Sequence, residues 1–340
     1  MTNEITMMPG TFSETLPTTR NASPAVSVIM PAYRVAEYIG AAIESVLNQT
    51  YTDHEIIVVN DGSPDTVELE SVLAPHRDQI IYIKQRNRGC SAARNTAIRA
   101  SRGRYIALLD PDDLWEPEYL RVQLEILERD PTIDVLYCDA LIFGDSDLSQ
   151  RRFMEVMPSR GQVTFNALIT QRCNVMISVT ARREAIMRAG TFDERLRSAE
   201  DFDMWLRIVQ DGGKIAYHRK VLVRYRRHQS SLSADPVWMC RHILEVLDRA
   251  KARNKLSALE SENLKMQIAR FRALIYLNEG KRAFFTGNAK SAIAKLTEAN
   301  SSLRSRKLAI VLMIMRAAPR LLLFIYNLRD RLLLGTNTKF

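Results

Sequence analysis

The sequence predicts an α/β fold with a doubly wound, mainly parallel sheet and a helical C-terminal appendage. Up to about residue 130, short apolar runs rich in Val and Ile alternate with segments of helical spacing. Strands and helices that alternate in this way form parallel sheets with right-handed crossovers. From about residue 236, apolar residues recur only at helical spacing. We therefore expect a disordered leader (1–24), an α/β domain (25–235) and a helical region (236–340).

Four apolar runs at the start of the domain are expected to be buried strands, because their hydrophobic residues are nearly continuous. These runs are 26–30, 55–59, 80–83 and 105–109. The segments between and after them are expected to form helices at 36–49, 66–73, 92–100 and 117–128. Further along, we expect strands at 134–138, 175–180 and 221–225, a helix at 202–209, and a variable loop at about 144–162.

Composition narrows the class of protein. With 340 residues, 46% of them hydrophobic, the chain can form one large domain and an appendage. The net charge of +9 favours phosphorylated ligands or anionic lipid as partners, and no nucleic-acid-binding motif is present. The leader lacks the basic start and apolar core of a signal peptide. The four cysteines form no CxxC pair, which argues against a zinc site or disulfides and favours a cytoplasmic location; they are Cys90, Cys138, Cys173 and Cys240.

Three carboxylates follow the fourth predicted strand within four positions: Asp110, Asp112 and Asp113. Parallel sheets bind ligands beyond the carboxyl ends of their strands, where these side chains are expected. Carboxylates this close repel one another unless a cation or hydrogen-bond donors hold them, and oxygen ligands suit Mg2+ or Mn2+. Asp113 and Glu116 also have the spacing of a helix-capping box. On this stretch alone, a metal site and a helix cap explain the residues equally well.

The ends of the first two strands place aromatic and acidic groups together. Pro31 and Tyr33 follow the first strand, and Asp61 follows the second. An aromatic face and a carboxylate suit a nucleobase, which stacks on the ring and donates an N–H to the acid. A plain Asx-turn beside a packed Tyr explains the same residues, and taken alone it is the better explanation.

Two further stretches carry groups that bind anions. Gly89 and Arg94 lie at the start of the third predicted helix, where backbone N–H groups and a guanidinium suit a phosphate. A dinucleotide-binding GxGxxG motif and a P-loop are both absent from the sequence. Arg226, His228 and Ser231 follow the last strand and could close over a diphosphate, and His228 could ligate a metal. An exposed basic strand end explains them about as well.

A second acidic pair, Glu200 and Asp201, precedes the helix predicted at 202–209. Ser198 and Asp201 again have the spacing of a capping box. The positive end of the helix is expected to favour the ionised form of these carboxylates. A carboxylate fixed at a helix start can serve as a general base for a sugar hydroxyl. Capping explains the pair equally well.

Taken in order, these motifs resemble family 2 glycosyltransferases, which have the GT-A fold. The resemblance rests on residues 26–33, 58–63, 87–95, 109–113 and 200–201, and it covers roughly 25–231. Each motif is weak alone, but the ordered set is specific. Pro111 departs from the pattern, since many relatives have a small residue there, and it removes a backbone donor.

The resemblance implies an inverting transferase whose nucleotide-sugar donor is most often UDP-linked. Asp201 then matches the catalytic base, with Glu200 as the second choice. Pro31, Tyr33, Asp61, Arg94, Asp110 and Asp112 are expected at the nucleotide, and Arg226, His228 and Ser231 at the diphosphate. The metal, Mg2+ or Mn2+, is expected on Asp112, Asp113 and His228, with Asp112 as the principal ligand and Asp110 and Asp113 as the next candidates.

The C-terminal region predicts contact with a membrane surface. Within 302–340, arginines and lysines alternate with apolar clusters at 308–315, 321–326 and 332–334, as in helices that lie on anionic lipid. No segment has the roughly 18 to 20 uninterrupted apolar residues that span a bilayer. A helical pair packed on the tail itself is the alternative. Segments 275–285 and 288–299, with Gly287 between them, resemble one tetratricopeptide-like hairpin.

The sequence therefore predicts glycosyl transfer from a nucleotide-sugar to a glycan or lipid-linked acceptor in cell-surface polysaccharide synthesis. The enzyme would lie in the cytoplasm, at the inner face of the cell membrane. A nucleotidyltransferase would need a Gly-rich basic loop after the first strand, which is absent. A non-catalytic nucleotide-sugar-binding or scaffold protein on the same domain is the alternative, and the intact acidic residues speak against it.

Overall fold

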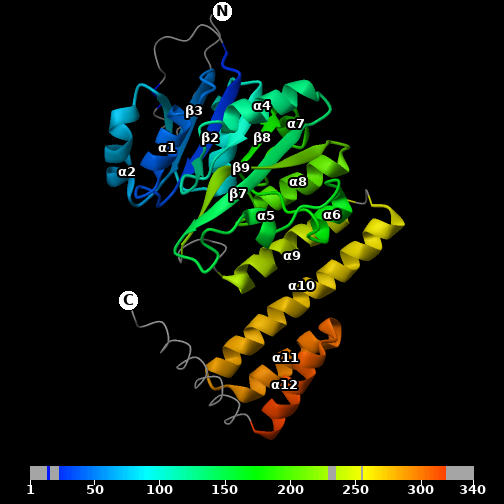
Figure 1. Cartoon of the computed structure of the whole chain (residues 1–340). Helices are drawn as coiled ribbons and strands as arrows, with labels where there is room; N and C mark the ends of the chain where they lie inside the picture. Colours follow the sequence, from blue (N-terminus) through cyan, green and yellow to red (C-terminus); the bar gives the residue numbers. More distant parts are fainter. Residues whose placement is uncertain (1–13, 16–22, 229–234, 254–255, 319–340) are drawn as a thin grey trace, which may run out of the picture. The chain divides into compact units, whose positions relative to one another are not determined.

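The computed structural model describes residues 14–15, 23–228, 235–253 and 256–318 (Figure 1). The chain forms two compact units, residues 1–231 and 232–340. The strands of the first unit are β1 (Glu14–Thr15), β2 (Val26–Ala32), β3 (His54–Asp61), β4 (Ile80–Gln85), β5 (Tyr105–Leu108), β6 (Leu114–Trp115), β7 (Val135–Gly144), β8 (Val179–Arg182) and β9 (Ile215–Arg227). Its helices are α1 (Ile39–Leu47), α2 (Thr66–Leu73), the 3-10 helix η1 (Ala74–His76), α3 (Cys90–Ala100), α4 (Tyr119–Arg129), α5 (Phe153–Val156), α6 (Phe165–Ile169), α7 (Arg183–Arg188) and α8 (Glu200–Gln210).

The strands form one sheet in the order β1-β4-β3-β2-β5-β8-β7-β9-β6. Strands β4, β3, β2 and β5 are parallel to one another, as the alternating pattern predicts. Strand β8 runs antiparallel to both β5 and β7, whereas β7 and β9 are again parallel. The sheet is therefore mixed, and its α/β class is as predicted. Because β2, β3 and β5 are parallel neighbours, their carboxyl ends lie at the same edge of the sheet.

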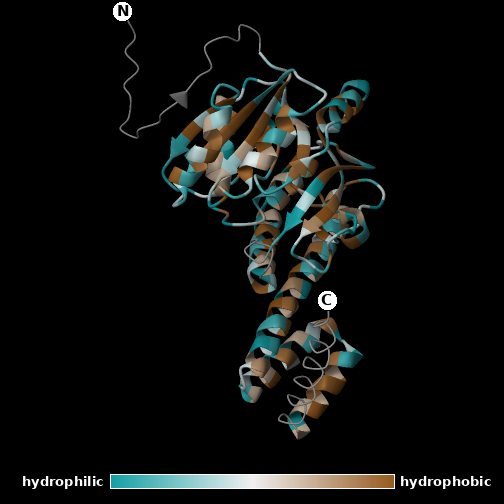
Figure 2. Ribbon diagram, turned by 60° about the vertical axis from the view of Figure 1, so that its left-hand side comes forward, coloured by the Kyte–Doolittle hydropathy of each residue, from teal (hydrophilic) through white to brown (hydrophobic). Residues whose placement is uncertain are grey.

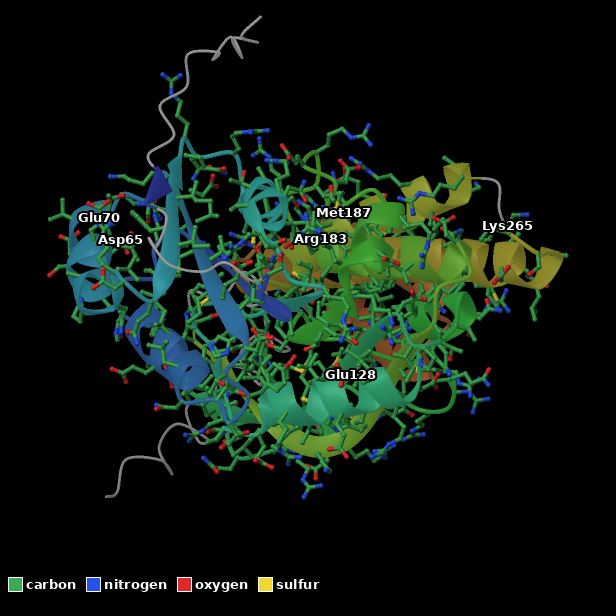
Figure 3. The ribbon with its side chains drawn as sticks, turned by 90° about the horizontal axis from the view of Figure 1, so that it is seen from above. Asp65, Glu70, Glu128, Arg183, Met187 and Lys265 are labelled. Carbon is green, nitrogen blue, oxygen red and sulfur yellow. The ribbon has the colours of Figure 1, made fainter. Side chains whose placement is uncertain are left out.

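Helices cover both faces of the sheet, so the central strands are buried on both sides. Side chains of one face, among them Val28 and Met30 of β2, join a core with apolar residues of α1, α2 and α4. The intervening Ile29 points to the opposite face and is also fully buried. Figure 2 shows the resulting concentration of hydrophobic residues on the strands. In Figure 3, Glu128 marks α4, and Arg183 and Met187 mark α7 across the sheet from it.

Several strands are longer than their apolar runs predict. Strand β2 continues through Pro31 to Ala32, whose partner is Asn60, so Pro31 does not end it. Strand β7 has ten residues and β9 has thirteen, because they pair with each other beyond their apolar parts. Strand β8 begins only at Val179. Pairing with a neighbour supplies backbone hydrogen bonds that a single run of sequence does not reveal.

The structure contradicts both predicted capping boxes. Leu114–Trp115 forms β6, which pairs with β9, and α4 begins only after Glu118, which makes no side-chain cap. Asp113 therefore caps no helix, and its Oδ1 accepts a hydrogen bond from the backbone N–H of Arg226 (2.8 Å). At α8 the N-cap is Ala199, which has a left-handed backbone and no capping side chain. Glu200 and Asp201 do lie in the first turn of α8, as expected.

The second unit is helical throughout its described residues. It contains α9 (Pro236–Ala252), α10 (Ala258–Phe285), α11 (Ala289–Leu303) and α12 (Arg306–Ala317). The predicted hairpin is present between α10 and α11, with Gly287 in the turn at φ +82, but α10 has 28 residues and is longer than expected. Phe284, Leu296 and Met315 belong to a small core shared by α10, α11 and α12.

Some expectations fall on residues outside the described ranges. They include most of the leader, although Glu14–Thr15 pairs with β4, and the apolar clusters at 321–326 and 332–334. Among the described residues, none of the helices has both the length and the hydropathy of a membrane span.

Candidate functional site

The nucleotide end of the predicted site is built from the carboxyl ends of β2 and β3. Tyr33 follows β2 and is 42% exposed, so its ring is available to a ligand, whereas Pro31 is part of the strand. The backbone N–H of Arg34 donates to Ser63 Oγ (2.6 Å), which ties the two strand ends together. Arg34 has φ +56, an unusual value for a residue other than glycine. The segment bearing Tyr33 is therefore held in a fixed conformation.

Asp61, at the end of β3, is buried and holds the segment that precedes α3. Its Oδ1 accepts from Gln85 Nε2 (2.7 Å) and from the backbone N–H of Arg88 (2.9 Å), and its Oδ2 accepts from the N–H of Gly89 (2.7 Å). Gly62 has φ +63, and a Cβ there would lie 2.7 Å from the backbone N of Asn87. The carboxylate thus stabilises this segment. Its Oδ2 accepts one hydrogen bond and can accept a second one from a ligand.

Arg94 of α3 connects the two acidic motifs. Its side chain is 4% exposed, and Nη2 lies 2.7 Å from Asp110 Oδ1, while Nη1 bonds to Glu200 Oε1. The guanidinium also lies over the ring of Phe192, 5.4 Å from its centroid. The sequence predicts that Arg94 contacts the nucleotide, but in the structure its guanidinium pairs with two carboxylates of the protein. Its contacts are those of a residue that positions Asp110 and Glu200.

The following residue, Asn95, was missed by the sequence analysis as a site-forming residue. Its Nδ2 donates to the Phe192 carbonyl (2.9 Å), and the Phe192 N–H donates back to Asn95 Oδ1 (2.9 Å). A second bond from Nδ2 reaches Glu194 Oε1 (3.1 Å). Asn95 therefore fixes the loop that leads to α8. The Arg-Asn pair of the 87–95 motif was the available signal, but sequence alone does not show its partners.

Asp112 and Asp113 face β9. Arg226 donates from Nε to the Asp112 carbonyl (2.8 Å), in addition to its backbone bond to Asp113. His228 Nε2 lies 3.2 Å from Asp112 Oδ2, and its ring stacks on Tyr38 at 5.2 Å between centroids. The structure thus brings Arg226 and His228 to the acidic motif. Ser231 lies outside the described residues.

The pKa values of three acidic residues at the site are raised, each by burial together with neighbouring charges. Burial, followed by the nearby Asp112 and Asp110, raises the pKa of Asp113 well above its usual range. Burial also raises the pKa of Asp110, against the opposing effect of Arg94. Burial and then Glu200 raise the pKa of Asp201 to about 7. The predicted stabilisation of ionised Asp201 by the helix end is therefore outweighed by burial and by its acidic neighbour.

The residues around Asp113 are suited to a divalent cation that also binds the substrate. No group of three or more His, Cys, Asp or Glu side chains among the described residues is arranged to hold a metal by itself. However, Asp113 Oδ2 is buried without a hydrogen-bond partner, beside the Asp112 carboxylate. Mg2+ often binds through one or two carboxylates and completes its shell with substrate phosphates and water. Asp112 and Asp113 fit that mode.

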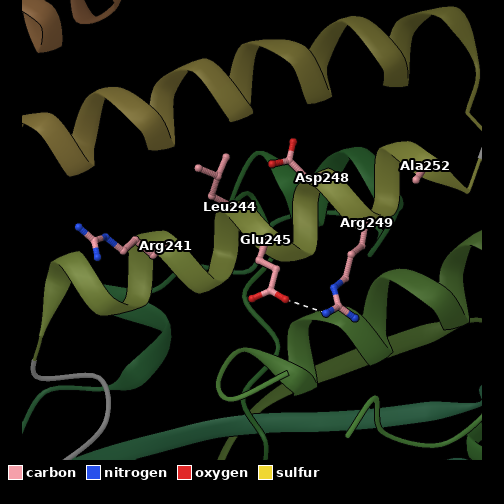
Figure 4. A pocket seen from close by; sticks show the side chains of 6 residues that line it. All are labelled: Arg241, Leu244, Glu245, Asp248, Arg249 and Ala252. Carbon is pink, nitrogen blue, oxygen red and sulfur yellow. Dashed lines mark hydrogen bonds and ion pairs between the residues drawn. The ribbon is translucent and has the colours of Figure 1, made fainter. Parts of the chain in front are cut away.

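A separate hollow lies along α9. Figure 4 shows its lining and the ion pair between Glu245 and Arg249 (2.7 Å). All six lining residues belong to α9, and no predicted site residue is among them; they are Arg241, Leu244, Glu245, Asp248, Arg249 and Ala252. We assign no role to this hollow.

Solved structures share the fold of this chain. The mannosyltransferase PcManGT from Pyrobaculum calidifontis, in complex with GDP-Man and Mn2+, matches with a TM-score of 0.59 and 20% identity, over 87% of this chain and 81% of that one. Residues 1–349 of S. aureus TarS, in complex with UDP-GlcNAc, match with a TM-score of 0.58 and 18% identity, over 86% and 87% of the two chains.

Sequence relatives match about 60% of this chain. An uncharacterized glycosyltransferase of Methanocaldococcus jannaschii is 30% identical over 211 residues, which are 60% of this chain and 71% of the relative. Chondroitin synthase of Escherichia coli is 33% identical over 203 residues, which are 58% of this chain and 29% of that protein. Uncharacterized glycosyltransferases of Rickettsia are about as similar, and the matched part of this chain spans from 30% (Rickettsia bellii) to 65% (Rickettsia prowazekii) of their length.

The family model described as glycosyl transferase family 2 matches residues 27–194, which include every predicted motif up to the Glu-Asp pair. The pair itself follows a few residues later and is tied to the matched region by Arg94. The ordered motifs, the GT-A-like sheet and the relatives agree, and the chain belongs to glycosyl transferase family 2.

Proposed function

We propose that this protein is an inverting glycosyltransferase that moves a sugar from a UDP-linked donor to a hydroxyl of a glycan or lipid-linked acceptor. The supporting observation is the double engagement of Arg94 by Asp110 and Glu200. It brings the acidic motif that follows β5 and the acidic pair of α8 into one site. A donor-binding motif beside a candidate base is the arrangement that glycosyl transfer requires.

The donor would bind across the carboxyl ends of β2, β3 and β5. Tyr33 offers an exposed ring to the base, and Pro31 and Asp61 border it. Structural neighbours are described in complex with UDP, UDP-GlcNAc and GDP-Man, which supports a nucleoside diphosphate donor. Asp110 and Asp112 would lie at the ribose and diphosphate, and Arg94 would act on the nucleotide through Asp110. Arg226, His228 and Ser231 would contact the diphosphate.

The proposed chemistry is a single displacement. Asp201 takes a proton from the acceptor hydroxyl, and that oxygen attacks the anomeric carbon from the face opposite the nucleotide. The bond between the anomeric carbon and the diphosphate oxygen breaks, and the nucleoside diphosphate leaves with the electron pair. A pKa of about 7 suits Asp201 to this task, because a base acts best when its pKa lies near the working pH. Glu200, held by Arg94, is the second candidate.

We propose Asp112 and Asp113, with His228 beside them, as the residues that hold Mg2+ or Mn2+. The bound ion would neutralise charge that develops on the leaving diphosphate. The buried, unpartnered Asp113 Oδ2 supports this assignment, as does the neighbour described with Mn2+. Arg226 fixes both acids through the Asp112 carbonyl and Asp113 Oδ1.

The C-terminal region (236–340) would bring the proposed transferase domain (25–235) to an anionic membrane surface at the inner face of the cell membrane. On α12, the apolar residues Ile310 and Met313 are more than half exposed, and Ile314 is 37% exposed. The basic residues Arg306 and Lys307 begin the same helix. Exposed apolar residues next to basic ones are typical of helices that bind lipid surfaces. A lipid-linked acceptor in polysaccharide synthesis would be accessible from that position.

Calorimetry of UDP binding with Mn2+, followed by turnover of a panel of UDP- and GDP-sugars, tests the proposed function. We expect metal-dependent UDP binding and slow hydrolysis of one UDP-sugar without an acceptor. Nucleotide binding without turnover of any sugar, with or without cell-envelope acceptors, would favour a non-catalytic binding protein instead. If neither UDP nor GDP binds, the nucleotide-sugar function is rejected.

A further inference from the structure

The outer face of β7 and β9 carries a row of three neighbouring side chains, Arg152, Leu141 and Arg224. The proposed reaction does not use the two arginines of this row. Leu141 of β7 is paired with Arg224 of β9 on one side and forms a bridge with Arg152 on the other. Residues directly opposite one another on neighbouring strands present their side chains on the same face of the sheet. Arg152, Leu141 and Arg224 therefore share a face. Figure 1 shows β7 and β9 side by side.

This face is turned to solvent and not to the core. Ile142 and Val223, which alternate with these positions, are 2% and 0% exposed. Leu141 is only half-buried, and Arg152 and Arg224 are exposed. The two arginines are thus exposed on either side of the half-buried, apolar Leu141.

Neither guanidinium is bonded to a carboxylate among the described residues. Arg152 meets Glu155 through its backbone N–H, which donates to Oε2 (3.4 Å), and its guanidinium has no such bond. Arg224 lies over the ring of Phe143, 5.3 Å from the centroid, and forms no ion pair with any residue that the structure describes. Stacking on a ring fixes the plane of a guanidinium and leaves its N–H edge free for an anion. Both arginines of α4, in contrast, pair with glutamates.

The row leads directly to the donor end of the site. Arg226 is two residues beyond Arg224 on the same face, about 7 Å further along the strand. Its guanidinium lies over the same Phe143 ring (4.3 Å), and it donates to the Asp112 carbonyl. Arg152 lies in the segment 144–162, the variable loop. An anion held by Arg152 and Arg224 would therefore lie beside the donor and not on it.

We propose that Arg152 and Arg224 form a subsite for a phosphate group carried by the acceptor. The strand spacing of about 4.8 Å places their backbones roughly 10 Å apart across Leu141, so both side chains can reach one tetrahedral anion. Each guanidinium can donate two parallel hydrogen bonds to phosphate oxygens. This inference rests on the proposed function, and it adds the chemical class of the acceptor. The phosphate could belong to a lipid diphosphate or to a phosphodiester in a glycan.

The test uses the full chain with UDP and Mg2+ at saturation, so that the donor site is filled. Calorimetry then measures binding of farnesyl diphosphate, as a lipid diphosphate, and of a glycerol phosphate oligomer, as a phosphodiester. Farnesol and glycerol are the uncharged counterparts. The variant is the double substitution R152A/R224A. The matched control is R151A/R227A, which removes the same charge at positions adjacent to the row that alternate to the other face.

We expect at least one phosphate probe to bind the wild type and to lose about tenfold or more in affinity in R152A/R224A. The control should lose less than about twofold, and the uncharged probes should not bind. The probe that binds identifies the source of the phosphate. If both double variants lose the same affinity for the phosphate probe, the probe responds only to the overall charge of the surface, and the subsite is rejected. So would binding of neither phosphate probe by a wild-type protein that binds UDP.

Failure of the inference and failure of the proposed function remain distinguishable. UDP binding and UDP-sugar hydrolysis are measured first on each variant, and they depend on the donor site alone. If the wild type does not bind UDP, the proposed function fails. Thermal unfolding of both double variants shows whether they are folded, and exposed arginines without partners should change it little.

Discussion

Arg94 Nη2 lies 2.7 Å from Asp110 Oδ1, and the same guanidinium bonds to Glu200. One buried cation thus joins the acid that follows β5 to the acidic pair at the start of α8. These acids are about 90 residues apart in the chain, and this single side chain contacts both of them. The predictions for Arg94 and for the acids follow from this contact.

Arg94→Lys keeps the charge but cannot engage both carboxylates with a planar fork. We expect kcat to fall about 10- to 100-fold, as for loss of one charge-assisted hydrogen bond, while UDP affinity changes less. Arg94→Met removes the charge and leaves Glu200 and Asp110 unpaired, which we expect to lower the free energy of unfolding by about 3–5 kcal/mol. Steady-state kinetics and urea unfolding measure the two effects. Wild-type kcat in R94K would contradict the positioning role.

Asp201→Asn removes the proposed base and keeps the size of the side chain. We expect transfer to fall about 10²- to 10⁴-fold, the range associated with a general base. UDP binding and thermal unfolding should remain close to wild type, because Asp201 lies at the acceptor side of the proposed site. Glu200→Gln, measured in parallel, distinguishes the two acids. If E200Q loses more activity than D201N while both bind UDP, Glu200 is the base.

The rate of transfer should depend on pH through Asp201. Burial and Glu200 raise its pKa to about 7, so much of the side chain is protonated and inactive below that pH. We therefore expect kcat/KM to rise with pH through about 7 and then level off. In E200Q the like charge that raises the pKa is gone, and the rise should move to lower pH. A pH–rate profile that is identical in E200Q would contradict this coupling.

Removal of the metal and substitution of Asp112 should have the same consequence. In EDTA, or in Asp112→Asn with Mn2+ present, we expect transfer to fall by about 100-fold or more, since a bound cation supplies several kcal/mol of charge stabilisation. UDP affinity should lose its dependence on Mn2+. Excess Mn2+ should restore the EDTA-treated wild type but not the variant. Full activity without divalent cations would reject the metal assignment.

Membrane contact can be tested by flotation with anionic and neutral liposomes. We expect the full chain to float with anionic liposomes and a chain without residues 302–340 to remain in solution. Ile310→Ser/Met313→Ser, which leaves the charges unchanged, should reduce flotation because it removes exposed apolar surface from α12. Equal flotation of the full and shortened chains would reject this role for the C-terminal segment.

The sequence alone determined the strands and helices that have strong local patterns. Helix α2 has the predicted bounds. Strands β2, β3 and β4 contain the predicted apolar runs, and β5 ends one residue before its run does, because a buried strand needs nearly continuous apolar residues. The ordered motifs also indicated the family. These features depend on residues near one another in the chain, so periodicity and composition reveal them.

Only the tertiary structure decided which side chains meet. Asp113 was a capping candidate by spacing, but pairing of β6 with β9 brings it to Arg226 instead. Arg94 was predicted to bind an anion of the nucleotide because of its place on α3. In the structure its guanidinium pairs with two carboxylates of the protein, because α3 packs near the start of α8. The pKa of Asp201 likewise reflects burial and not the helix end. Such contacts join segments far apart in sequence, and the spacing of residues along the chain does not encode them.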